Sequence, residues 1–227
     1  MTSIGHAIYL HGFASSPLSS KAQRFERELA RHGVTFSCPD FNLPSFEDLT
    51  VTRMLHQTRE AIHAAPKRPL ALIGSSLGAF VAVHAAAQDA ADHGGPAVDR
   101  LLLLAPALDL REGPQDANVE EWRRTGRLRV FHHAWNEYRD VGYALYEDAA
   151  RFDALNLKVP LPTLVFQGTH DRAVDPRMVE RWALDRPNVQ LHLLDDEHQL
   201  SNSIDQIWTE SERFFGLPST PASAPRA

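Results

Sequence analysis

The chain has 227 residues, a formal net charge of -6 at pH 7 and a composition that is 43% hydrophobic and 23% charged. That length suits one domain with a sizeable core, and the mild acidity argues against a nucleic-acid partner. The chain has a single cysteine, so no intramolecular disulfide is expected. The start MTSIGHAIYLHGF lacks a signal-peptide pattern, and no apolar run reaches the ~20 residues that a membrane helix needs. These features predict a cytoplasmic protein with no membrane partner.

Short apolar runs alternate with helical patterns along the chain. The runs predicted as buried strands are 7–12, 34–40, 69–74, 100–106, 162–168 and 188–194. The segments predicted as helices between and after them are 19–33, 45–66 with Ser45 as its N-cap, 77–95 and 201–215. Such alternation predicts an α/β fold with a mostly parallel sheet that helices cover on both faces.

Two stretches depart from this rhythm. Residues 109–153 form an irregular insertion that is rich in tryptophan and tyrosine. Ligands of such sheets bind at the carboxyl ends of the strands, where this insertion emerges, so we interpret it as a cap over a pocket. The alternative is a packed insertion that covers a sheet edge. The Pro/Ala/Ser-rich end 217–227 is predicted to be disordered, which leaves 1–216 as a single domain.

The stretch GSSLG over 74–78 matches the pattern G-x-S-x-G with Ser76 at its centre. It follows an apolar strand and opens an Ala-rich helix, which is the setting in which this pattern presents a nucleophile. The positions two before and two after the nucleophile must be small, because the strand and helix backbones crowd together there. Gly74 and Gly78 meet that requirement, whereas the same positions around Ser75 hold isoleucine and leucine. Ser76 is therefore the predicted nucleophile, and the alternative is an ordinary tight turn.

A serine hydroxyl is a weak nucleophile at neutral pH and needs a general base. His198 follows the last predicted strand, from where it can reach back over the carboxyl edge of the sheet. The acid that orients it should follow the preceding strand, where Asp171 and Asp175 lie. Asp175 precedes a proline and is predicted as a helix N-cap, so Asp171 is the predicted acid. Asp109, after the strand before, is the reserve candidate, and the alternative for His198 is a solvated loop histidine.

A tetrahedral intermediate needs two N–H donors for its oxyanion. The predicted donors are the backbone N–H of Leu77, which directly follows Ser76 at a helix N-terminus, and that of Phe13, after the first strand. His11 and Gly12 end that strand and let the backbone turn toward the same point. Read alone, these two residues form a simple turn.

Together these residues resemble the α/β-hydrolase superfamily. The resemblance covers about residues 4–215 and rests on YLHGF, GSSLG, the acid loop QGTHDRAVDP and the EH pair before the last helix. The longer stretch LHGFASSPLSSKAQ resembles the small bacterial YqiA-like esterases. Because the chain begins at the strand that bears His11 and Gly12, the likeness implies a compact sheet of about six strands, with helices on both faces and a small cap-like insertion.

The resemblance also implies an activity. It implies hydrolysis of a small-molecule carboxylic ester through an acyl-enzyme intermediate, with no metal or organic cofactor. By position, Ser76 is the nucleophile, His198 the general base and then acid, and Asp171 the group that orients His198. Cleavage of a thioester, an amide or a carbon–carbon bond by the same triad stays open, as does a non-catalytic binding protein of this fold. The sequence leaves the oligomeric state open.

Two features of the insertion have a plain and a functional interpretation. The four arginines of EEWRRTGRLR are expected on a solvated, salt-bridged surface, and the alternative is that one of them attracts an acidic substrate. The pair His132-His133 suggests a metal site, but neighbouring residues of a strand point to opposite faces, and no further ligands accompany the pair.

Overall fold

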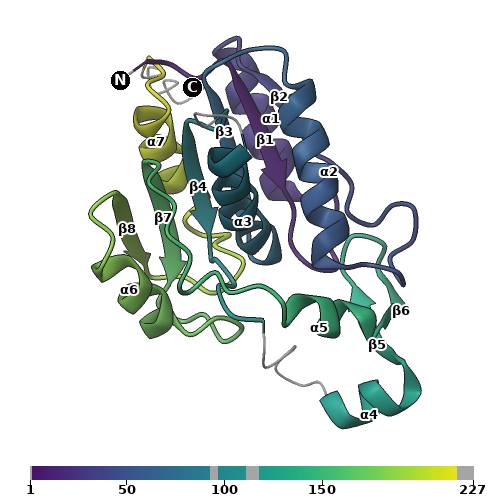
Figure 1. The fold of residues 1–227 in the computed structure, drawn as a ribbon. Coiled ribbons are helices and arrows are strands. Elements are labelled where there is room, and N and C mark those ends of the chain that lie inside the picture. Colours follow the sequence, from purple (N-terminus) through teal and green to yellow (C-terminus); the bar gives the residue numbers. More distant parts are fainter. Residues whose placement is uncertain (1, 93–96, 111–117, 219–227) are drawn as a thin grey trace, which may run out of the picture.

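The structure, a computed structural model, describes residues 2–92, 97–110 and 118–218. Its main sheet consists of β1 (His6–Leu10), β2 (Thr35–Ser37), β3 (Leu70–Ser75), β4 (Arg100–Leu104), β7 (Thr163–Gly168) and β8 (Val189–Leu194). The strand order is β2-β1-β3-β4-β7-β8, and every neighbouring pair is parallel (Figure 1). The prediction of a parallel sheet of about six strands is therefore confirmed.

Helices cover both faces of this sheet (Figure 1). The long helices are α1 (Ser20–Arg31), α2 (Val51–Ala64), α3 (Leu77–Asp92), α6 (Pro176–Leu184) and α7 (Ile204–Phe214). Side chains of α1 and α7 pack into the core on one face, and side chains of α2, α3 and α6 pack into the core on the other. No helix in the described ranges is both long enough and apolar enough to cross a bilayer.

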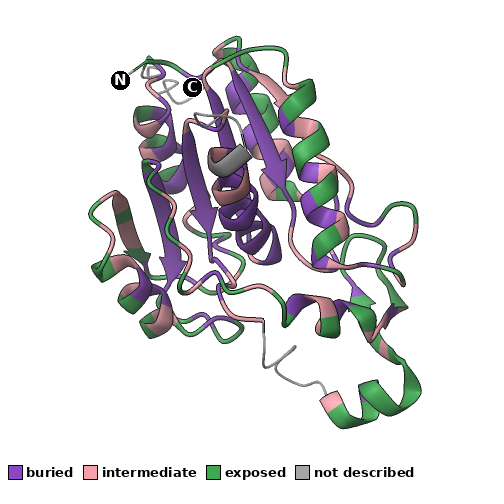
Figure 2. Cartoon of the chain, viewed as in Figure 1, coloured by how far each residue is buried: buried purple, intermediate pink, exposed green. Residues whose placement is uncertain are grey.

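Alternation along the strands builds these two cores. Ile8 and Leu10 of β1 contact the core beneath α2 and α3, whereas Ala7 and Tyr9 contact the core beneath α1 and α7. The central strands are buried along their whole length, as Figure 2 shows. Burial on both faces explains why the sequence shows continuous apolar runs rather than alternating ones.

The start of α2 differs from the prediction. The N-cap is Thr50, whose side-chain oxygen accepts the Arg53 N–H at 3.2 Å, so the assignment to Ser45 is wrong. The residues before Thr50 form a turn in which the Leu49 N–H donates to the Phe46 carbonyl, and both of these side chains are buried. The turn places Phe46 and Leu49 in the core, and α2 therefore begins after it rather than at Ser45.

The insertion holds α4 (Val119–Thr125), a separate antiparallel hairpin of β5 (Arg127–His132) and β6 (Glu137–Gly142), and α5 (Ala144–Ala149). It lies at the end of the sheet toward which the strand arrows point (Figure 1). The hairpin is attached by backbone hydrogen bonds from Gly142 to Glu47 and from Ala134 to Ala14, and the Phe46 ring packs edge-on against His132. It therefore rests on the connections that follow β1 and β2.

Two segments of the predicted organisation fall partly outside the described residues. Residues 111–117 of the insertion and 219–227 of the end that is predicted to be disordered lie there. Before that end, Leu217 is buried, and its N–H donates to the Glu212 carbonyl at 3.0 Å.

Candidate active site

Ser76 occupies a sharp turn between β3 and α3. Its φ of 53° lies in the left-handed region, which costs a non-glycine residue free energy and is common at functional turns. A Cβ on Gly74 would lie 2.5 Å from the Ala79 Cα, and a Cβ on Gly78 would lie 2.0 Å from the Leu10 carbonyl oxygen. Both positions therefore require glycine.

Three predicted residues meet at this turn, although they come from distant parts of the chain. His198 Nε2 lies 3.0 Å from Ser76 Oγ, and His198 Nδ1 lies 2.8 Å from Asp171 Oδ2. When the Nδ1–H donates to the carboxylate, Nε2 is left to accept the serine O–H. Asp171, and not the reserve candidate Asp109, takes the place beside the ring.

The Asp171 carboxylate is held by four donors. Its Oδ1 accepts the backbone N–H groups of Ala173 and Val174 at 2.8 and 2.9 Å, and its Oδ2 accepts Gln167 Nε2 at 2.9 Å in addition to His198. Burial of this side chain acts to raise its pKa, but the hydrogen bonds and the nearby His198 ring outweigh burial, and the pKa of Asp171 is lowered. The group is therefore ionised at neutral pH.

Gln167 was not identified from the sequence. It is fully buried at the end of β7, and its amide nitrogen contacts both Asp171 Oδ2 and the Gly168 carbonyl. The available signal was a lone polar residue at the end of an otherwise apolar run, TLVFQ. Its position makes it a support for the carboxylate, because it fixes the oxygen that faces His198.

The loop that carries His198 is stabilised by hydrogen bonds to the Asp196 side chain. This buried carboxylate accepts the backbone N–H groups of Glu197 and Ser203 at 2.8 and 2.9 Å. Its pKa is lowered, because these bonds outweigh the effect of burial. Gly168 permits the loop to approach β7, since a Cβ there would lie 2.5 Å from the Asp196 carbonyl oxygen. Asp196 therefore shapes the loop that carries His198.

The two predicted oxyanion donors border the same turn. Within the part of the chain that the structure describes, neither the Leu77 N–H nor the Phe13 N–H donates to a protein acceptor. Gly12 brings the loop after β1 close to the nucleophile, because a Cβ there would lie 3.4 Å from the Ser76 Cβ. His11 is buried; its Nδ1 lies 2.9 Å from the Gly12 carbonyl, and its Nε2 accepts the Phe41 N–H at 3.0 Å.

A groove of about 570 Å³ adjoins these loops. Its lining combines the serine-rich connection before α1, the hairpin turn and one residue next to His198, and comprises Ser15, Ser16, Pro17, Leu18, Ser19, Ser20, Asp40, His133, Ala134, Trp135 and Gln199. The Trp135 ring stacks on the His132 ring at 3.8 Å. The lining combines hydroxyl groups, one carboxylate and four apolar residues, and it does not include Ser76, Asp171 or His198.

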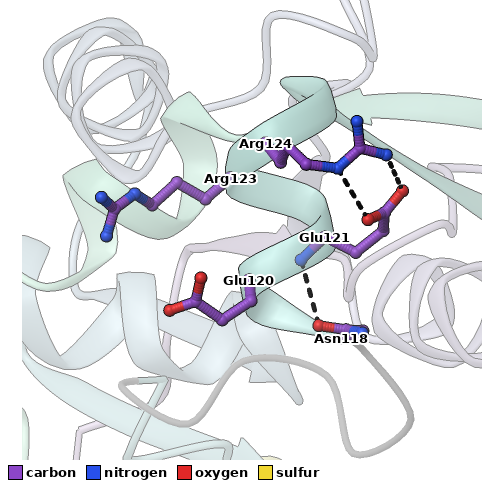
Figure 3. Close-up of a pocket in the computed structure, with 5 residues that line it drawn as sticks. All are labelled: Asn118, Glu120, Glu121, Arg123 and Arg124. Atoms are coloured by element: carbon purple, nitrogen blue, oxygen red, sulfur yellow. Dashed lines mark hydrogen bonds and ion pairs between the residues drawn. The ribbon is translucent and has the colours of Figure 1, made fainter.

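The arginines of the insertion lie on an exposed surface. Figure 3 shows a second hollow, of about 410 Å³, which is lined by α4 and the residue that caps it. Arg124 donates twice to the Glu121 carboxylate within this hollow, and Arg127 pairs with Glu47 at 2.9 Å. Arg129 lies 5.6 Å from the centre of the Tyr138 ring. These contacts favour the solvated, salt-bridged interpretation.

The two adjacent histidines lie where β5 ends, His132 as its last residue and His133 directly after it. His132 is fully buried and contacts Asn42 Oδ1 at 3.1 Å, whereas His133 is exposed. Among the described residues, no cluster of three or more His, Cys, Asp or Glu side chains is arranged to hold a metal ion.

Residues 6–212 match a family described as "Uncharacterised protein family (UPF0227)". No curated protein matches the chain in sequence. Among solved structures, a putative hydrolase from Agrobacterium vitis S4 is 23% identical, with a TM-score of 0.80 and coverage of 93% of this chain and 88% of that chain.

Two further solved structures are similar over almost their whole length. A putative hydrolase of the alpha/beta superfamily from Xanthomonas campestris pv. campestris is 27% identical, with a TM-score of 0.61 and coverage of 93% of this chain and 95% of that chain. Alpha/beta hydrolase domain-containing protein 10 from mouse is 21% identical, with a TM-score of 0.75 and coverage of 96% and 93%. These likenesses show that the fold is the α/β-hydrolase fold, as the sequence predicts.

Proposed function

This chain belongs to the UPF0227 family and has the α/β-hydrolase fold, and from that premise we propose that it is a serine hydrolase that cleaves a small carboxylic ester. The observation that carries the proposal is the continuous chain of contacts from Ser76 Oγ through the His198 ring to Asp171. A serine held at a positive φ with a base at 3.0 Å is arranged for nucleophilic attack.

The first half of the proposed reaction forms an acyl-enzyme. Ser76 Oγ attacks the ester carbonyl carbon while its proton passes to His198 Nε2. The N–H groups of Leu77 and Phe13 stabilise the negative charge that develops on the carbonyl oxygen. The protonated ring then gives its proton to the departing alcohol oxygen, and the C–O bond breaks. Asp171 stays ionised throughout and stabilises the imidazolium ion.

The second half of the reaction returns the serine. A water molecule takes the place of the alcohol and loses a proton to His198 as its oxygen attacks the acyl carbon. Collapse of the second intermediate releases the carboxylic acid and restores the Ser76 hydroxyl.

The substrate that suits this site is small and polar. The groove beside the loop of His198 offers hydroxyl groups from Ser15, Ser16, Ser19 and Ser20 and the carboxylate of Asp40 for hydrogen bonds to such a molecule. Thioesters, amides and carbon–carbon bonds remain candidates because the same triad can attack them, and the choice among them depends on the groove rather than on the triad. The names of the similar hydrolases support hydrolysis as the reaction class.

The first prediction concerns the nucleophile. A fluorophosphonate probe should label the wild-type protein on one serine, and Ser76→Ala should abolish that labelling. The same variant should lose about 10⁴-fold or more in kcat on short p-nitrophenyl esters, because the attacking oxygen is gone. Its circular dichroism spectrum should match that of the wild type.

Ser75→Ala is the matched control, since it removes a neighbouring hydroxyl and leaves the proposed nucleophile in place. Labelling that persists in Ser76→Ala and disappears in Ser75→Ala would overturn the assignment. A wild-type protein that neither reacts with the probe nor turns over esters, thioesters or amides would favour a binding protein of this fold. Labelling with turnover of thioesters alone would keep the triad and change the substrate.

A further inference from the structure

Lys21 joins the start of α1 to the loop that carries the proposed base. It lies in the first turn of α1, directly after the connection from β1 that contains Phe13. Its Nζ donates to the backbone carbonyl of Gln199 at 2.7 Å. Gln199 follows His198, so a single hydrogen bond joins the loop of the base to the segment of the predicted oxyanion donor.

Other restraints on the His198 loop come from within the loop and from the connection after β7. The Asp196 carboxylate binds N–H groups within the loop, and the His170 N–H donates to the Asp196 carbonyl at 3.0 Å from the connection after β7. These bonds fix the loop against β7. The bond from Lys21 restrains the same loop against a different element, α1.

The charge of Lys21 does not stabilise the folded protein, because the side chain is largely removed from water. Burial lowers the pKa of Lys21 to about 8, although the carboxylates of Asp196 and Asp171 act in the opposite direction. A lysine pKa that is lower in the folded than in the unfolded chain means that the ammonium ion reduces the free energy of unfolding below pH 8. That cost is removed as the pH rises from about 8 to the unfolded value.

We propose that Lys21 is a positioning residue, which holds the loop of His198 against the first turn of α1 through its bond to the Gln199 carbonyl. This inference rests on the proposed serine-hydrolase function of the same site. The ammonium ion touches no reacting atom in this scheme; it acts through the position of the imidazole ring. A small displacement of that ring from Ser76 is costly, because proton transfer requires a short and aligned contact.

Removing the Lys21 amine should lower kcat and leave KM nearly unchanged. Lys21→Met keeps the length and the apolar stem of the side chain and should reduce kcat on a short p-nitrophenyl ester by roughly tenfold or more, with KM within about twofold. Its unfolding temperature should equal or exceed that of the wild type, since a half-buried charge is removed. Lys21→Arg should restore most of the rate, because it still donates a charged hydrogen bond.

The alkaline side of the pH profile provides a second readout. The charged groups that face Lys21 are Asp171 and Asp196, which are ionised over this range, and His198 follows in the same loop. The wild-type kcat should fall as the pH rises through about 8, because the bond to the carbonyl loses its charge. Lys21→Arg should shift that fall to higher pH, since a guanidinium does not titrate there.

Lys67→Met is the matched control. Lys67 also donates to a backbone carbonyl, that of Gly33 at 3.4 Å, but it precedes β3 at the end of the sheet away from the site. This control should keep the wild-type kcat and pH profile. Wild-type kcat and an unchanged alkaline limb in Lys21→Met would overturn the inference.

A measurement without substrate separates this inference from the proposed function. The Nδ1–H of His198 donates to a buried carboxylate and should give a downfield proton resonance in NMR spectra. Loss or shift of that resonance in Lys21→Met, with the wild-type signal in Lys67→Met, would support positioning even if the wild type hydrolysed no ester. An unchanged resonance together with unchanged kinetics would refute the role of Lys21, whereas absent labelling by the fluorophosphonate would refute the hydrolase function.

Discussion

At the scale of single residues, the site depends on a carboxylate that cannot change its partners freely. Asp171 receives two backbone N–H groups on one oxygen and Gln167 with His198 on the other. An asparagine could keep the first pair of bonds through its oxygen. Its NH₂ group would then face two donors, and the imidazole would lose the tautomer that leaves Nε2 free to accept.

Asp171→Asn should therefore lower kcat by about 10²- to 10⁴-fold, which is less than the loss in Ser76→Ala. Steady-state kinetics on a short p-nitrophenyl ester measure this effect. Asp195→Asn is the control, because its carboxylate is exposed and pairs with the exposed His170 at 2.7 Å. Full activity in Asp171→Asn would show that another acid orients His198.

Sequence reasoning selected Ser76, Asp171 and His198, which the structure brings into contact, because each follows a strand and has a residue type that the proposed chemistry requires. It did not locate Gln167 or Lys21, since neither has a pattern of its own. The contact of Lys21 is with a main-chain carbonyl, and any residue type at position 199 would provide one. A contact of that kind becomes visible only when α1 and the loop of His198 are placed in space.

At the scale of elements, the crossing of β1 and α3 fixes the nucleophile turn. Gly78 lies in the first turn of α3, and a Cβ there would overlap the carbonyl oxygen of Leu10 at 2.0 Å. Glycine within a helix ordinarily costs about 0.5–1 kcal/mol relative to alanine. The close approach of two backbones reverses that preference at this position.

Gly78→Ala should consequently lower the free energy of unfolding instead of raising it. Overpacking of this kind costs about 1–3 kcal/mol or more, and urea denaturation measures it. An increase in the free energy of unfolding would contradict this prediction, because it would mean that α3 lies farther from β1 than the structure shows. Activity per folded molecule should also fall, because α3 carries the N–H of Leu77 and begins directly after Ser76.

The elements of the sheet followed from their apolar runs, whereas the elements of the insertion did not. The strand β5 alternates between exposed and less exposed residues, and in the described part of the chain β5 and β6 pair only with each other. The start of α2 was misplaced because Ser45 has the right residue type, and only the burial of Phe46 and Leu49 excludes a helix there. Local pattern alone could not weigh that tertiary contact.

At the scale of the whole molecule, one end of the sheet carries the candidate site and the other end holds distant parts of the chain together. The carboxyl end carries the candidate site and the insertion. At the amino end, Arg100 at the start of β4 donates to the Phe214 carbonyl at 2.6 Å and to the Thr2 carbonyl at 3.0 Å. One buried guanidinium thus joins the first and last parts of the described chain.

Arg100→Gln should lower the unfolding temperature and leave kcat unchanged. Hydrogen bonds from a charged group contribute about 1.5–3 kcal/mol, which corresponds to a fall of several degrees for a chain of this size. Differential scanning calorimetry beside an esterase assay measures both quantities. Arg213→Gln is the control, because that side chain is exposed and pairs only one helical turn away with Glu210. A loss of kcat in Arg100→Gln without a change in unfolding temperature would contradict this division.

The position of Arg100 also determines how the protein can be handled. Because Thr2 and Phe214 share one guanidinium at the amino end of the sheet, and Ser76 follows the carboxyl end of β3, a support or a reporter attached near either of them points the candidate site toward the solution. Immobilised molecules would then present a uniform, accessible face to soluble substrates. The same proximity means that a short peptide linker could join these two regions into a ring without crossing the carboxyl end of the sheet.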